Sequence, residues 1–229
     1  MKKIIFCLLI MSITHFCNAQ QPYGCSLSIS AKPSSNYLMF NYSGNAQLDA
    51  FLGREVNVLR NFFSVHPSVY YYQDPYPNAL AMRDVEDNMF PSGTVLLGIN
   101  LVNQEFQLSR SGTTIPFLLA HEFGHILDNS RNATAGYDSR TRELFADFQA
   151  GCFLFYRSVL TYTDVQAAMV SFYTKGDYDF NDPDHHGTSE ERLNAFTAGY
   201  NWLRAKALPG VYVSPDEAIQ ADKNYLGIR

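Results

Sequence analysis

The sequence predicts an α+β fold, in which a small N-terminal sheet with an amphipathic helix precedes a mainly helical half. Three observations predict it. Apolar residues recur at helical spacing over 45–64, β-rich runs fill much of 69–101, and helical patterns with capping signals follow from Thr113 onward. Because the strands and most of the helices occupy separate stretches of the chain, the pattern favours an α+β domain over a βαβ repeat.

Residues 1–19 read as a signal peptide and not as part of the fold. Two lysines follow the initiator methionine, the apolar run 4–13 is too short to span a bilayer, and Ala19 closes a stretch suited to signal peptidase. We expect cleavage after Ala19 and export to the periplasm or the extracellular space. A lipoprotein anchored at Cys17 is the alternative, although bulky Phe16 stands where that signal needs a small residue.

The remaining chain has the composition of one globular domain. Without its two leading lysines it carries 15 basic and 22 acidic residues, a net charge of about −7, and no basic run, which argues against nucleic acid as a partner. No later stretch approaches the ~18 apolar residues of a membrane helix, so we expect no membrane insertion after signal cleavage. We expect an irregular segment over 20–44 and a single domain over 45–229. A disulfide between Cys25 and Cys152 and two free thiols are both open.

The N-terminal half is expected to hold one helix and three strands. Apolar residues three or four apart predict the amphipathic helix over 45–64. The run 69–72 is rich in tyrosine and is closed by an Asp-Pro pair, as a strand is. Two further strands are expected at 78–82 and 94–101, the last of them rich in valine, leucine and isoleucine.

The C-terminal half is expected to be helical. Thr113 or Thr114 can cap the first helix, and Pro116 suits its first turn. Thr188-Ser-Glu-Glu191 has the pattern of a capping box and opens another helix. In chain order the expected helices cover about 114–127, 141–159, 164–173, 188–207 and a short stretch from 214, with a loop over 176–187.

The motif His121-Glu122-Phe123-Gly124-His125 lies inside the first of these helices. Residues four apart share one side of a helix, so both imidazoles can face one metal ion. Glu122 lies about 100° further round the axis, where it can reach a water on that metal without binding the metal itself. This pattern is the signature of zinc metallopeptidases. The alternative is a buried histidine pair whose spacing arises by chance.

A third zinc ligand is needed, and the next helix offers one. A metzincin would place glycine at 128 and histidine at 131, but Asp128 and Arg131 stand there, which excludes that class. Glu143 and Asp147 are four residues apart and face one way. Glu143 could bind zinc while Asp147 accepts a hydrogen bond from a ligand histidine and so fixes its tautomer.

The alternative for this pair is an ordinary exposed helix face. Glu143 and Asp147 would then form surface ion pairs with Arg140 or Arg142. A chain that carries HEFGH and still lacks a third ligand favours the metal-binding interpretation.

HEFGH followed by Glu-Leu-Phe-Ala-Asp resembles the gluzincin peptidases. Among these the chain is most similar to the neutral zinc metallopeptidases of bacteria and to the family of the CAAX prenyl proteases and the heat-shock protease HtpX. The segments 77–81, 94–101 and 186–192 are also similar to segments of these families. The membrane helices of the prenyl-protease type are missing, which argues against a membrane-embedded substrate. The resemblance implies a zincin-like domain with zinc on His121, His125 and Glu143, catalysis by Glu122 and support from Asp147.

Two residues of the similar segment 186–192 have open roles. His186 precedes the capping box and could donate a hydrogen bond to an oxyanion formed at the metal, while a solvated loop histidine is the alternative. Arg192 could pair with a carboxylate near the metal, but we expect an ordinary surface arginine. We also expect the strand 94–101 to accept an extended peptide at its edge, as sheets do in such enzymes.

The function that these observations predict is that of a secreted zinc metallopeptidase acting on a peptide or protein substrate. One alternative is a non-catalytic module that contains zinc and binds a peptide or protein. Another is a latent enzyme blocked by its N-terminal segment. Glu122 favours an enzyme, because a structural zinc site is closed by four protein ligands and needs no base.

Overall fold

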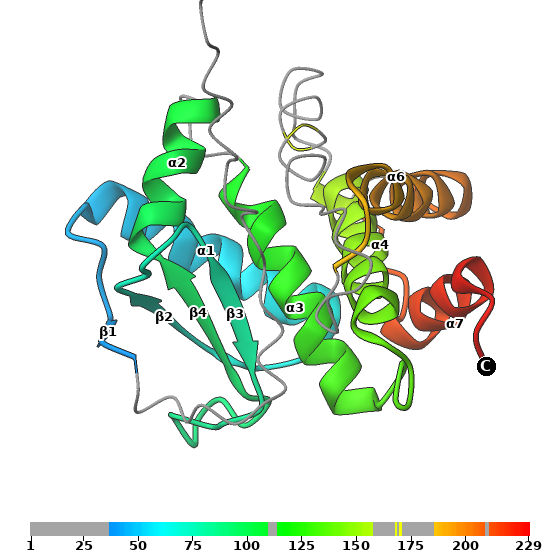
Figure 1. The fold of residues 1–229 in the computed structure, drawn as a ribbon, viewed down its shortest axis with the longest axis horizontal. Helices are drawn as coiled ribbons and strands as arrows, with labels where there is room; N and C mark the ends of the chain where they lie inside the picture. Colours follow the sequence, from blue (N-terminus) through cyan, green and yellow to red (C-terminus); the bar gives the residue numbers. More distant parts are fainter. Residues whose placement is uncertain (1–36, 110–113, 158–167, 169, 171–185, 209–210) are drawn as a thin grey trace, which may run out of the picture.

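The computed structural model describes residues 37–109, 114–157, 168, 170, 186–208 and 211–229 (Figure 1). These residues form a four-stranded mixed sheet and six helices, which confirms the predicted α+β class. Within these ranges no helix has both the length and the apolar character needed to cross a membrane. The predicted signal peptide 1–19, most of the segment 20–44 and most of the predicted helix 164–173 lie outside them.

The sheet has the strand order β1-β2-β4-β3. β2 and β4 are parallel, whereas β1 and β3 are antiparallel to their neighbours. β2 and β3 occupy their predicted positions, while β1 lies in the segment predicted to be irregular. The strands are β1 (Met39–Phe40), β2 (Ser68–Tyr72), β3 (Ala79–Met82) and β4 (Thr94–Gly98).

The prediction for 94–101 is wrong in two respects. β4 lies between β2 and β3, so both of its edges are already paired and it cannot accept a peptide. The strand also ends at Gly98, where α2 (Ile99–Ser109) begins. The carboxylate of Asp74 accepts hydrogen bonds from the backbone N–H groups of Asn100 (2.7 Å) and Leu101 (3.1 Å) and so caps this helix from a distant part of the chain.

The two faces of the sheet belong to different apolar clusters. Alternate residues such as Tyr71, Ala81 and Val95 join the main core, together with α1 (Ala46–Phe63) and the helices that follow. The opposite face carries a smaller cluster, formed by Tyr72, Leu80, Met82 and Leu96. At its N-terminus α1 is capped by Asn45, whose side chain accepts from two backbone N–H groups.

The helical half is built around α3 (Ile115–Arg131), which lies between the sheet and the remaining helices (Figure 1). From Ile115 to Asp128 every residue of α3 is buried, because the sheet, α1 and α4 all contact this helix. Thr114 occupies the N-cap position but makes no side-chain capping bond. The other three helices of the described C-terminal half are α4 (Ser139–Arg157), α6 (Ser189–Lys206) and α7 (Pro215–Leu226).

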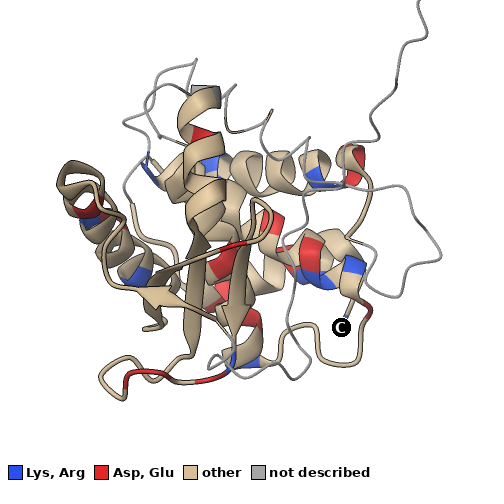
Figure 2. Cartoon of the chain, turned by 60° about the vertical axis from the view of Figure 1, so that its left-hand side comes forward, with Lys and Arg blue, Asp and Glu red and all other residues tan. Residues whose placement is uncertain are grey.

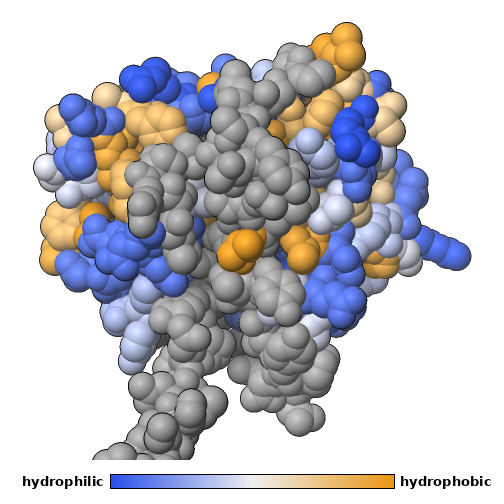
Figure 3. Space-filling view, turned by 90° about the horizontal axis from the view of Figure 1, so that it is seen from above, coloured by the Kyte–Doolittle hydropathy of each residue, from blue (hydrophilic) through white to orange (hydrophobic). Residues whose placement is uncertain are grey.

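The surface is mixed in character. Acidic and basic residues are interspersed along the described helices (Figure 2), and small groups of hydrophobic residues lie among hydrophilic ones in the view from above (Figure 3). Some large hydrophobic side chains are exposed on or beside β1, namely Leu38, Phe40 and Tyr42.

Candidate metal centre

The helix α3 places the HEFGH motif in the interior of the protein. His121, Glu122 and His125 are each about 1 % exposed. The two imidazoles lie on the same side of the helix, one turn apart, with ring centroids 4.5 Å from each other and the rings nearly perpendicular. The helical context predicted for the motif is therefore confirmed.

α4 brings Glu143 and Asp147 to the same place. The carboxylate of Asp138 accepts from the Thr141 N–H at 2.8 Å and so fixes the first turn of α4, and these hydrogen bonds lower the pKa of Asp138. α3 and α4 approach closely, since a Cβ on Gly124 would lie 2.9 Å from the Cα of Ala146. The glycine inside HEFGH thus allows the carboxylates of α4 to reach the histidines of α3.

The donor atoms of His121, His125 and Glu143 form a compact triangle. The two histidine Nε2 atoms are 3.0 Å apart, Glu143 Oε2 lies 3.3 Å from His121 Nε2, and the other oxygen, Oε1, lies 3.4 Å from His125 Nε2. Contacts of 3.3–3.4 Å are long for hydrogen bonds. They match the edge of about 3.3 Å expected between two ligands of a tetrahedral ion with bonds of 2.0–2.1 Å.

Among the described residues, these three form the group of histidines and acids whose donor atoms all lie within 4.8 Å of one another. The set could therefore hold a metal ion, and two imidazole nitrogens with one carboxylate fit zinc. Neither oxygen of Glu143 has a well-formed hydrogen bond within the described chain, and both are buried. Buried polar atoms of this kind need a partner, which a bound cation would supply.

Asp147 lies where the sequence analysis expected it. Its Oδ1 is 2.9 Å from His121 Nδ1, with both side chains buried. Because an ionised carboxylate only accepts, Nδ1 of His121 carries the proton, and its Nε2 presents a lone pair to the triangle. The exposed-face alternative for Glu143 and Asp147 is wrong, since both carboxylates are completely buried.

Arg192 is buried, so the expectation of an ordinary surface arginine is wrong. It is about 1 % exposed, and its Nε and Nη2 each donate to Asp147 at 2.8 Å. Its Nη2 also lies 3.3 Å from Glu143 Oε2. α6 packs directly against α4 and so brings Arg192 close to it. This packing is possible because Gly151 and Gly199 have no Cβ, which would collide with the backbone of the facing helix. A glycine inside a helical pattern often has a packing reason, so these two glycines could have indicated the close approach of the helices from the sequence.

His186 approaches the same cluster from the segment before α6. Its Nδ1 lies 3.3 Å from Glu143 Oε1, and its side chain keeps 17 % of its surface exposed. The following Gly187 has φ of 88°, which turns the chain into the Thr188–Glu191 capping box at the start of α6. His186 is thus a partly exposed neighbour of the buried cluster and is not one of its three donors.

The electrostatics of the centre keep both acids ionised. Burial acts to raise the pKa of Glu143, but His125, Arg192 and His121 outweigh it and hold this pKa well below its usual value. Burial likewise acts on Asp147, and the pairing with Arg192 and His121 lowers its pKa nonetheless. Glu143, Asp147 and Arg192 by themselves carry one net negative charge in the interior, which a protonated histidine or a bound cation can offset.

Cys152 is one of the two cysteines whose pairing the sequence left open. It is a free, buried thiol on α4, and its Sγ donates to the Gly199 carbonyl at 3.3 Å. Burial raises the pKa of this thiol well above its usual value. Cys25 lies outside the described residues.

In comparisons with known proteins, no family model, no curated protein and no solved structure matches the chain. The functional argument therefore rests on the geometry of the centre.

Proposed function

We propose that the protein is an exported zinc-dependent peptidase that hydrolyses peptide bonds in peptide or protein substrates. The observation that carries the proposal is the buried cluster of His121, His125 and Glu143, in which each pair of side chains approaches to 3.0–3.4 Å and one donor atom from each lies within 4.8 Å of the others. Glu122 follows the first ligand directly on α3, as the base of such a peptidase does.

The charge balance of the centre supports a dication. Glu143, Asp147 and Arg192 leave a net negative charge at a place where every one of these side chains is at most 1 % exposed. An uncompensated charge is costly in such surroundings. A zinc ion would offset it and could bind both Nε2 atoms, which lie 3.0 Å apart.

Each side chain then has a distinct part in the chemistry. Bound zinc would polarise the scissile carbonyl and lower the pKa of a water beside it to about 7. Glu122 would act as the general base, taking a proton from the attacking water and passing it to the leaving amine. His186, at the more exposed side of the cluster, donates a hydrogen bond to the carbonyl oxygen as negative charge develops there.

A non-catalytic zinc module is the first competing function. A structural zinc site is normally closed by four protein ligands. The cluster in the described residues has three, and His186 stands outside it. The lack of a fourth donor in this group, among the residues that the structure describes, supports a catalytic role.

A latent peptidase is the second competing function, and the burial of the centre favours it. All three donors and Glu122 are about 1 % exposed or less, so a substrate reaches them only after the protein opens. Latency predicts that hydrolysis begins after a cleavage or a conformational change and not before.

The experiment is cleavage of an unstructured protein such as reduced casein by wild type and by Glu122→Gln, with zinc quantified in both. The substitution keeps the size of the side chain and removes the base. We expect equal zinc and a rate lower by about 10²–10⁴, the contribution of a general base. Cleavage should stop with a chelator and return with zinc. Equal, measurable cleavage by the two proteins would refute the enzyme.

A latent enzyme is distinguished by a second arm. Wild type and Glu122→Gln are both pretreated with a trace of trypsin, which is then inhibited, before the casein assay. Activity that appears only in pretreated wild type identifies latency. Full zinc without hydrolysis in any arm would favour the binding module.

A further inference from the structure

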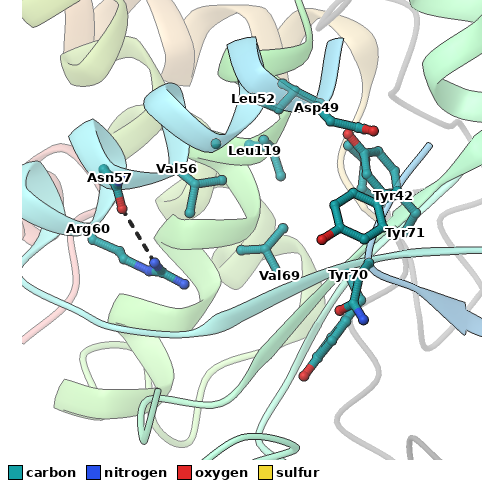
Figure 4. Close-up of a pocket in the computed structure, with 13 residues that line it drawn as sticks. Tyr42, Asp49, Leu52, Val56, Asn57, Arg60, Val69, Tyr70, Tyr71 and Leu119 are labelled. Atoms are coloured by element: carbon teal, nitrogen blue, oxygen red, sulfur yellow. Dashed lines mark hydrogen bonds between the residues drawn. The ribbon is translucent and has the colours of Figure 1, made fainter. Parts of the chain in front are cut away.

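A pocket lies away from the candidate metal centre, between α1 and the outer part of the sheet. It encloses about 350 Å³. Figure 4 shows Leu52, Val56, Val69 and Leu119 in its middle, with polar side chains towards both ends. A pocket of this size with an apolar floor and a few polar groups is typical of a small-ligand site.

α3 separates this pocket from the metal centre. Leu119 lines the pocket, whereas His121 and His125 contribute their donor atoms to the candidate metal site. At 100° per residue, these histidines lie on roughly the opposite side of α3 from Leu119. The pocket therefore forms a separate site, and its role does not depend on the proposed peptidase activity.

Beside the pocket, one main-chain position at the edge of β2 has no strand partner in the described chain. Ser68 donates its N–H to Gly93 on the β4 side, whereas Gln73 donates to Leu38 on the β1 side. Odd-numbered residues of β2 therefore face the outer edge. Tyr71 is paired there with Phe40, and the Pro67 carbonyl accepts from Arg60 at 2.8 Å. Val69 lies between them, and in the described chain no strand pairs with its outer side.

The two ends of the pocket carry opposite charges. Asp49 and Tyr71 lie at one end, and Asn57 and Arg60 at the other (Figure 4). Asp49 accepts from the Ser43 N–H at 2.9 Å but has no cationic partner in the described residues. Arg60 stacks over Phe90, donates to the Pro67 carbonyl and to Asn57, and is influenced by the charge of Asp87, but no acidic group lies within 4 Å of it in the described residues. Each charge can still take an ionic ligand.

We propose that this pocket binds a short free peptide in extended conformation, with its amino terminus at Asp49 and its carboxylate at Arg60. The peptide would run antiparallel to β2, would exchange main-chain hydrogen bonds with Val69, and would place one apolar side chain on the floor.

The direction and length of the ligand follow from the neighbours. β1 is antiparallel to β2 and ends at Phe40, so the peptide continues its line along the β2 edge. Asp49 and Arg60 are eleven residues apart on α1, roughly 16 Å along its axis, and their side chains reach inward. Three or four extended residues, at about 3.3 Å each, fill the remaining distance.

The test is titration of the purified protein with the tripeptide Ala-Leu-Ala, with excess EDTA present so that no metal contributes. Binding is followed by calorimetry and by the amide NMR signal of Val69. Gly53 lines the pocket, and a Cβ added there would meet nothing within 4 Å. Gly53→Leu fills the pocket and should weaken binding at least about tenfold, whereas Gly53→Ala, the matched control, should stay within about threefold of wild type.

The terminal charges are tested with acetyl-Ala-Leu-Ala-amide. Blocking each end should weaken binding about two- to fivefold, the effect of a partly exposed ion pair. Asp49→Asn should abolish the difference between the free and the acetylated amino terminus. Absence of saturable binding, equal affinity of Gly53→Leu, or loss of binding in His121→Ala would each overturn the proposal. None of these outcomes bears on hydrolysis at the metal centre.

Discussion

Asp147 links two residues of the metal centre that come from different helices. Its Oδ1 accepts from His121 Nδ1 at 2.9 Å, and both of its oxygens accept from Arg192 at 2.8 Å. The carboxylate therefore fixes the tautomer of a proposed metal ligand and neutralises a buried guanidinium. Both effects depend on its negative charge.

Asp147→Ala should weaken zinc binding by about 10–100-fold, because the orientation of His121 is no longer fixed. It should also lower the free energy of unfolding by roughly 3–5 kcal/mol, since Arg192 stays buried without its partner. Competition with a chromophoric chelator measures the first effect and urea unfolding the second. Asp138→Ala, at the start of α4, is the control and should leave zinc affinity unchanged. Unaltered zinc affinity in Asp147→Ala would show that Asp147 is only structural.

Some residues of the candidate site could be predicted from the sequence, and one could not. Spacing of four residues places His121 with His125, and Glu143 with Asp147, on one side of a helix in any fold, so these sites could be predicted. Arg192 could not, because its pairing depends on where α6 packs. That packing is a tertiary property of three helices and has no local pattern.

At the scale of elements, glycines set the distance between α4 and α6. A Cβ at Gly199 would collide with the Phe148 backbone, whereas one at Gly53 on α1 would meet open space. Gly199→Ala should destabilise the protein by about 1–3 kcal/mol or more through overpacking. Gly53→Ala should stabilise it by about 1 kcal/mol through helix propensity. Chemical denaturation of both variants tests the contrast, and a neutral Gly199→Ala would mean that α4 and α6 are not in close contact.

The docking of α7 on α4 includes a buried acid. Asp222 accepts from Gln149 Nε2 at 2.8 Å, and its Oδ1 has no hydrogen-bond partner in the described chain. Burial raises the pKa of Asp222 well above its usual value of 3.8. The folded state thus holds a proton that the unfolded state releases.

Asp222 should therefore make stability depend on pH in a defined direction. The protonated Asp222 adds to the free energy of unfolding. This addition is fully present below about pH 3.8 and is lost as the pH rises through the raised pKa of the folded state. Asp222→Asn removes this loss and still accepts from Gln149, so the variant should be more stable than wild type at pH 8, with a smaller difference at pH 4. Urea midpoints at the two pH values measure it. A variant less stable at pH 8 would contradict the assignment.

The start of α2 shows why some elements escape prediction. The run after Gly93 is rich in β-forming residues, and nothing local signals a helix at Ile99. The cap comes from Asp74, twenty-six residues before Asn100, and Gly98 leaves room for its carboxylate. The α1 and α6 helices, by contrast, carry their own capping residues and could be placed to within two residues.

At the scale of the whole molecule, the metal centre joins α3 and α4, and Arg192 ties α6 to both. A metal bound there stabilises the folded protein only, by about 2.7 kcal/mol at a hundred times its Kd. For a chain of this size we expect a chelator to lower the unfolding midpoint by roughly 5–10 °C and added zinc to restore it. His125→Ala is the control and should show little response. A wild-type midpoint that ignores the chelator would mean that no metal contributes to the fold.

The central claim is that zinc is bound by His121, His125 and Glu143, and X-ray absorption at the zinc edge of the purified protein tests it most directly. The predicted spectrum shows about one zinc per chain with two imidazoles and oxygen ligands at about 2.0–2.1 Å, and no sulfur. Glu143→Ala should lose most of this zinc. A sulfur shell near about 2.3 Å, a single imidazole, or full zinc retained by Glu143→Ala would contradict the claim.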